Sequence, residues 1–155
     1  MKPIAVAAVL ALMVAVPAVA RDAVAPAATA NPTLRSVPVV LTARGKPHRY
    51  RVEVAATALE QNRGLMFRKL MPRGHGMIFP FAPAKPATFW MENTVLPLDL
   101  VFIAPDRTVL RVATGKPFAR DILDSGGPVI AVLELNAGEA ARIGLQPGDR
   151  VDYAL

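Results

Sequence analysis

The sequence predicts a single mainly-β domain, a β-sandwich or distorted barrel of about seven to eight short strands with two short helices. The chain has 155 residues, enough for one ordinary domain. Short apolar runs separated by Pro, Gly, Asn and Asp recur along most of it, as in strands joined by turns. These runs do not alternate with helical segments, which disfavours a doubly wound parallel sheet.

The segment Met1–Ala20 has the pattern of a secretory signal peptide. Lys2 supplies a positive start, Ile4–Val16 is apolar, and Ala18-Val19-Ala20 fits the small-x-small cleavage rule. A membrane anchor would need about 20 apolar residues, and Pro17 interrupts this run. We therefore expect cleavage after Ala20, a periplasmic or secreted protein, and no stable membrane span after cleavage.

Residues 21–35 are rich in Ala and Pro without periodicity, which predicts a flexible linker before a domain at 36–155. The domain opens with two predicted strands, Val37–Leu41 and His48–Val54, which form a hairpin. In the second strand apolar residues alternate with charged ones, including Arg49 and Arg51. We interpret this alternation as the solvated face of an edge strand, where positive charge discourages pairing with other sheets.

Two segments have helix-start signals. Thr57 with Glu60 forms a capping box that opens a short helix to about Phe67. Asn136 with Glu139 resembles a second capping box, and Gly144 would end that helix. The remaining predicted strands are Ile78–Phe81, Thr88–Met91, Leu98–Ile103, Val109–Ala113, Val129–Leu135 and Arg150–Tyr153.

Composition excludes several classes of chemistry. The chain has no cysteine and two histidines, His48 and His75, so disulfides, thiol nucleophiles and multi-histidine metal centres are excluded. It has no phosphate-binding loop, dinucleotide fingerprint or H-E-x-x-H motif. We expect no cofactor and no metal. Net charge is +6, but we expect no nucleic-acid partner for an exported chain. The string around Ser125, D-S-G-G-P, lacks the context of a protease nucleophile and is interpreted as a turn before a strand.

Arg63 is the first polar residue that looks out of place. Leu59, Arg63 and Met66 have the spacing of one helix face, which would turn the guanidinium toward the core. A buried guanidinium needs a carboxylate or carbonyl partner. Gly64, a poor helix former, would mark a close backbone approach.

Asp99 and Glu134 are carboxylates inside apolar strands. Burial should raise the pKa of each unless a cation or N–H donors counter it. One interpretation is structural, with Arg63 paired to Asp99, to Glu134 or to neither. The other is a small-ligand pocket, to which the F-W-M-E-N-T string adds aromatic and polar groups. The predicted pocket residues are Arg63, Trp90, Asn93, Thr94, Asp99 and Glu134.

Several strings together resemble the uncharacterised domain-of-unknown-function 192 family of bacteria and archaea. They are R-G-L-M at 63–66, H-G-M at 75–77, F-W-M-x-N-T-x-x-P-L-D at 89–99, S-G-G at 125–127 and V-L-E-L-N-A-G at 132–138. The resemblance covers about Val39–Val151. It implies a single mainly-β domain, sandwich- or barrel-like and often exported. It implies no activity, cofactor or catalytic residue.

Three functional hypotheses follow. The leading one is a non-enzymatic small-ligand-binding or accessory module of the cell envelope, with no catalytic residue and an unknown oligomeric state. The second is a small envelope hydrolase or lyase with Asp99 and Glu134 as acid/base pair, which needs the carboxyl groups within about 10 Å of each other. The third is a protein–protein adaptor in which the strand of Arg49 and Arg51 adds to a partner's sheet.

Overall fold

The computed structural model describes residues 29–155. The expected signal peptide, its cleavage site and residues 21–28 of the expected linker lie outside the described residues. The domain contains seven strands and two short helices. In chain order they are β1 (Ser36–Ala43), β2 (Lys46–Val54), α1 (Ala58–Arg63), β3 (His75–Phe89), β4 (Leu98–Ile103), β5 (Val109–Gly115), β6 (Leu123–Asn136), α2 (Glu139–Ile143) and β7 (Arg150–Tyr153).

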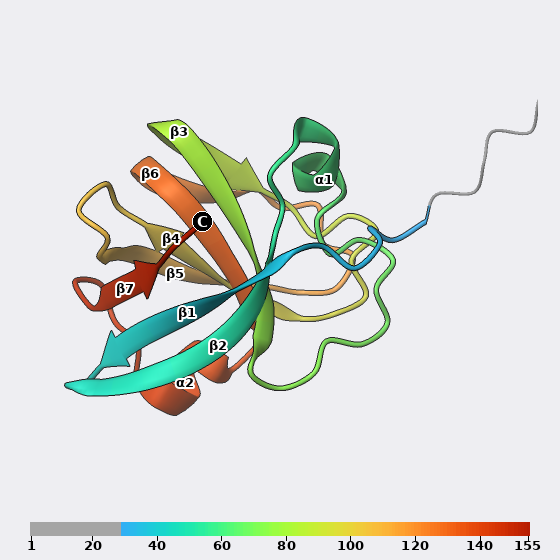
Figure 1. Cartoon of the computed structure of the whole chain (residues 1–155). Coiled ribbons are helices and arrows are strands. Elements are labelled where there is room, and N and C mark those ends of the chain that lie inside the picture. The colour runs from blue at the N-terminus through green and yellow to red at the C-terminus, as the bar shows by residue number, and fades with distance from the viewer. Residues whose placement is uncertain (1–28) are drawn as a thin grey trace, which may run out of the picture.

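The strands form one strongly curled sheet in the order β5-β4-β6-β3-β2-β1-β7 (Figure 1). All neighbours pair antiparallel except β2 with β3. The two edges approach each other, because Thr108 and Arg150 form a bridge next to β5 and β7. The amide of Val151 also donates to the carbonyl of Arg107, at 2.9 Å. The predicted mainly-β class is confirmed, as a half-barrel.

Two strands are longer than the sequence pattern indicated. β3 joins the predicted Ile78–Phe81 and the first half of the predicted Thr88–Met91 into one bent strand, with register shifts between Pro80 and Lys85. Its prolines remove ladder donors without ending the extended backbone. β6 begins already at Leu123 and therefore contains the D-S-G-G-P string. There the buried Ser125 hydroxyl accepts from the amide of Ala87 on β3 and donates to the carbonyl of Gly127.

The predicted edge position of β2 is wrong. β2 pairs with β1 along its length and with β3 over Arg51–Val54, so it lies inside the sheet. Its basic residues mark a solvated face, and an interior strand with one wet face has the same alternation as an edge strand. The adaptor hypothesis therefore loses the edge on which it depended. The edges are β5 and β7.

Each face of the sheet carries its own hydrophobic core. One core gathers β1, β2, β7 and α2, with Val39, Leu41 and Ile143 among its buried side chains. The other lies on the α1 side and contains Phe79 and Phe102. Because successive side chains of a strand point to opposite faces, neighbouring residues of β4 and β6 contribute to different cores. The sheet therefore separates the buried side chains of one core from those of the other.

The helices begin where short-range signals place them, with one change. Thr57 and Glu60 form the predicted capping box of α1, which ends at Arg63 before the C-cap Gly64. The second helix starts later than predicted, because Gly138 and not Asn136 is its N-cap. Gly144 ends it, as expected. No helix among residues 29–155 is long and apolar enough to cross a membrane.

The segment before β1 is tied to the domain. Asn31 is buried and donates to the carbonyls of Glu60 and Gly64, both at 3.0 Å. Arg68 donates to Glu53 and to the carbonyl of Pro32. From Asn31 onward the chain is therefore in contact with the domain, where a flexible linker was expected. An Ala- and Pro-rich composition did not reveal these contacts, because one buried asparagine supplies the anchor.

Candidate functional site

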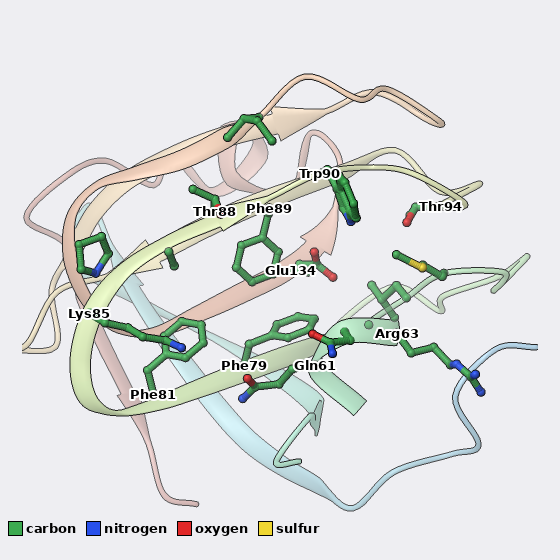
Figure 2. Close-up of a pocket in the computed structure, with 17 residues that line it drawn as sticks. Gln61, Arg63, Phe79, Phe81, Lys85, Thr88, Phe89, Trp90, Thr94 and Glu134 are labelled. Carbon is green, nitrogen blue, oxygen red and sulfur yellow. The ribbon is translucent and has the colours of Figure 1, made fainter. Parts of the chain in front are cut away.

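A cavity of about 520 Å³ opens between the end of α1, β3 and β6. Four aromatic side chains form much of its wall, and the polar groups include one buried carboxyl (Figure 2). The aromatic and polar lining residues are Phe79, Phe81, Phe89, Trp90, Gln61, Asn62, Arg63, Lys85, Thr88, Thr94 and Glu134. Apolar walls with a few polar groups are the usual composition of a small-ligand pocket.

Glu134 supplies the buried carboxyl. On β6 it pairs with Met77 of β3 and Leu100 of β4, so its side chain shares their face of the sheet. The residue is 5% exposed, and its Oε2 has no hydrogen-bond partner in the part of the chain that the structure describes. Burial raises the pKa of this carboxyl to about 8. Burial therefore favours the neutral carboxylic acid at pH 7.

Aromatic rings surround this carboxyl. Phe79 and Phe89 meet edge to face, with ring centroids 5.1 Å apart. Figure 2 shows the Glu134 carboxyl among these two rings and Trp90. Trp90 is 49% exposed, although large aromatic side chains usually bury most of their area. An exposed indole beside a hollow is thus available to a ligand.

Gly64 sets the distance between the α1 side and the rings. A Cβ atom added to it would lie 3.3 Å from Cζ of Phe79, closer than ordinary van der Waals contact. Its φ of 47° is also a conformation that glycine adopts most easily. The predicted close backbone approach is confirmed, and its neighbour is the aromatic wall of the cavity.

The cavity brings together four of the six predicted pocket residues, Arg63, Trp90, Thr94 and Glu134. Arg63 does not occupy the predicted apolar helix face. α1 contains no buried residue and Leu59 is 69% exposed, because the helix ends at Arg63 and cannot continue the periodicity to Met66. The Arg63 side chain is directed away from Glu134 (Figure 2), so it pairs with neither candidate carboxylate.

Asp99 lies on the other face of the sheet. On β4 it pairs with Leu135, whereas its neighbour Leu100 pairs with Glu134. Its Oδ1 accepts from the Thr114 hydroxyl at 2.8 Å, and its Oδ2 accepts from the amide of Ala140 at 3.0 Å. Asp99 thus caps the start of α2 from a distant strand. The acid/base pair hypothesis is wrong, because the sheet separates the two carboxyls.

Asn93 and Thr94 have different places in the turn that follows β3. Asn93 has a φ of 59°, and its carbonyl accepts from the amide of Phe67 at 2.8 Å. Asparagine tolerates this left-handed conformation well, so Asn93 is a turn residue outside the cavity lining. Thr94 is buried and lines the cavity. Its hydroxyl donates to the carbonyl of Glu92 at 3.4 Å.

The sequence analysis missed most of the aromatic wall. Phe79 and Phe81 alternate with Ile78 and Pro80, which places both rings on the face of Met77. That alternation was a readable signal. Lys85, whose Nζ lies 4.9 Å from the ring centroid of Phe81, had no such signal because the bend in β3 brings it there.

Comparisons with known proteins place the chain in a family. The sequence model of DUF192, described as "Uncharacterized ACR", matches residues 39–153. A candidate transcription regulator from Sinorhizobium meliloti has a similar crystal structure, with a TM-score of 0.76 and 40% identity, and the match covers 79% of this chain and 97% of that one. A Novosphingobium aromaticivorans protein of unknown function is similar at a TM-score of 0.75 and 45% identity, over 80% of this chain and 91% of that one. A search of curated proteins found no significant match. The chain belongs to the DUF192 family.

Proposed function

We propose that this protein binds a small organic molecule in the cavity between α1, β3 and β6. The observation that carries the proposal is the Glu134 carboxyl, which is buried at an aromatic wall and whose Oε2 has no partner among the described residues. A buried polar group without a hydrogen bond costs about 1–3 kcal/mol. A ligand that pairs with Glu134 would recover that cost on binding.

Binding is a better account of this cavity than hydrolysis. Acid/base hydrolysis of the kind considered above needs two carboxyls facing one substrate. The sequence offered Asp99 as the second carboxyl. Asp99 lies on the opposite face of the sheet, where it accepts hydrogen bonds from the Thr114 hydroxyl and the Ala140 amide. The proposed role is therefore that of a ligand-binding or accessory module without catalysis.

The export signal remains part of the proposal. We infer that the protein loses Met1–Ala20 and acts in the periplasm or outside the cell, on the basis of the signal-peptide pattern. Cell fractionation followed by N-terminal sequencing tests this. A chain that starts at Arg21 in the periplasmic or secreted fraction is expected. A chain that retains Met1 in the cytoplasm would overturn the localisation while leaving the cavity proposal untouched.

The binding proposal is tested by thermal unfolding against a panel of cationic, neutral and anionic metabolites. A ligand at 100 times its Kd stabilises a protein by about 2.7 kcal/mol, which raises Tm by several degrees in a domain of this size. Trp90→Ala should weaken binding of the hit, because it removes an exposed ring of the cavity wall.

Phe118→Ala is the matched control, since Phe118 is an exposed aromatic residue outside the cavity lining. Its Tm shift with the same ligand should equal that of the wild type. Equal loss of the shift in both variants, or no shift with any compound of the panel, would contradict the proposed pocket.

A further inference from the structure

If the Glu134 cavity binds a small molecule, as proposed above, its residues also indicate the chemical class of that ligand. We propose that its ligand is an organic cation with an alkylated ammonium nitrogen, for which Glu134 is the counter-ion and the aromatic wall is the cage. Three features of the cavity support this assignment: a buried carboxyl oxygen without a hydrogen-bond partner among the described residues, the aromatic rings around it, and a ring of the same wall that already holds a cation.

The group that complements Glu134 in this proposal carries a positive charge. Oε2 of Glu134 is sealed from solvent and has no partner among residues 29–155, and desolvation is the cause of its raised pKa. An ammonium ion near a buried carboxyl favours the ionised form. Binding of a permanent cation to the neutral acid therefore releases one proton. It follows that the affinity depends on pH, in a direction opposite to that for a ligand that accepts a hydrogen bond from the acid.

Other charged groups near Glu134 leave room for this cation. Lys85 of β3 and Arg63 at the end of α1 line the cavity, while Asp99 of β4 belongs to the opposite face. Arg63 is directed outward, and Lys85 lies toward Phe81, away from Glu134 (Figure 2). The Lys85 ammonium, 4.9 Å from the Phe81 centroid, shows that a ring of this wall already holds a cation on its face.

The surroundings of the carboxyl favour an alkylated nitrogen over a primary amine. A primary ammonium has three N–H donors that need acceptors. Figure 2 shows the Glu134 carboxyl among the rings of Phe79, Phe89 and Trp90, whereas the polar lining residues other than Thr94 lie farther along the wall. Methyl groups on nitrogen remove the unsatisfied donors and spread the charge, and aromatic faces attract such ions by cation–π interaction. Glu134 then supplies the one full negative charge.

The test compares choline with its uncharged carbon isostere, 3,3-dimethyl-1-butanol, by isothermal titration calorimetry between pH 6 and pH 9. Neither compound changes its charge in this range. With a carboxyl pKa of about 8, the affinity for choline should rise about tenfold from pH 6 to pH 7 and level off above pH 8. The isostere should bind at least tenfold more weakly at pH 8, on the order of one lost charge contact.

Two variants isolate the carboxyl. Glu134→Gln should lose both the choline affinity and its pH dependence. Glu92→Gln removes the same charge from a side chain outside the cavity lining, where Glu92 pairs with Arg120, and should bind choline like the wild type. If Glu134→Gln does not fold, the wild-type pH profile and the choline-to-isostere ratio still decide the question.

Several results would overturn the assignment. They are equal binding of choline and the isostere, a choline affinity that is flat or falls with pH, and no binding of choline at any pH. In each case the metabolite panel with Trp90→Ala separates the two proposals. A panel compound that depends on Trp90 keeps the pocket and rejects the cation, whereas the lack of any such compound rejects both.

Discussion

Asp99 and Glu134 are buried on neighbouring strands, yet their surroundings differ in kind. Each carboxylate oxygen of Asp99 accepts a hydrogen bond, one from the Thr114 hydroxyl and the other from the amide of Ala140. Glu134 faces the other side of the sheet, where Oε2 has no partner among the described residues and an aromatic cavity lies beside it. A satisfied buried carboxylate holds a fold together. An unsatisfied one is a cost that a ligand can remove.

The difference follows from register. In the β4–β6 ladder Asp99 pairs with Leu135 and Leu100 pairs with Glu134, so the two carboxyls cannot share a face. The Asp99 face is covered by α2, whose first turn has free N–H groups that need an acceptor. The Glu134 face is covered by rings and by the short α1, which contribute no donor to Oε2.

The largest expected effect is the pH dependence of stability that Glu134 confers. The pKa of Glu134 is about 8 in the folded protein, against the ordinary 4.5, so between these values the folded state holds a proton that the unfolded state releases. Its contribution to stability is complete below pH 4.5 and is lost as the pH rises through 8. Relative to Glu134→Gln, the wild type should lose roughly 3 kcal/mol of unfolding free energy between pH 5 and pH 8.

Urea unfolding at several pH values measures this difference. Glu92→Gln, whose carboxylate is paired with Arg120 at the surface, is the control and should follow the wild type. Parallel pH profiles of the wild type and Glu134→Gln would show that Glu134 does not titrate in this window, which would contradict the prediction.

Removal of the satisfied carboxylate should have the next largest effect. Asp99→Ala leaves the buried Ala140 amide and the Thr114 hydroxyl without their acceptor, which costs about 2–3 kcal/mol of unfolding free energy. Urea unfolding at pH 7 tests this, with the exposed Asp121→Ala as control. A loss no greater than that of the control would mean that the cap contributes little, and that Asp99 is not the structural half of the pair.

The smallest expected effect concerns the wall of the Glu134 cavity. Gly64→Ala places a Cβ atom 3.3 Å from the Phe79 ring, and should lower the unfolding free energy by about 1–3 kcal/mol. Gly45→Ala has a similar positive φ but open space around it, so it should cost about 1 kcal/mol. Thermal unfolding of both variants compares them. Equal losses would indicate backbone strain alone and no contact with the ring.

Sequence reasoning identified both carboxylates but could not assign their roles. A carboxylate in an apolar strand is visible in the sequence, and the period of two along β4 places Asp99 on the face of Val101 and Ile103. Whether Asp99 and Glu134 share a face depends on how β4 and β6 align, and that pairing joins residues far apart in the chain. Local patterns carry no information about it.

Local signals performed best where the physics is local. The Thr57–Glu60 capping box and the Gly144 stop involve only neighbouring residues, and both were predicted. Arg63 was misplaced because a helix face was extended beyond the residue where the helix ends. The linker was predicted from composition, but Asn31 is held by carbonyls of α1 and its cap, which is a tertiary contact.

The pairing of β1 with β7 joins the first strand of the domain to the last. During synthesis the ribosome therefore releases almost the whole domain before the partner of β1 is available. Contacts between such distant segments are slow to form, because a long loop must close before they are gained. Until then, the edge of β1 opposite β2 has no partner strand. The half-barrel can be completed only after Arg150–Tyr153 has left the ribosome.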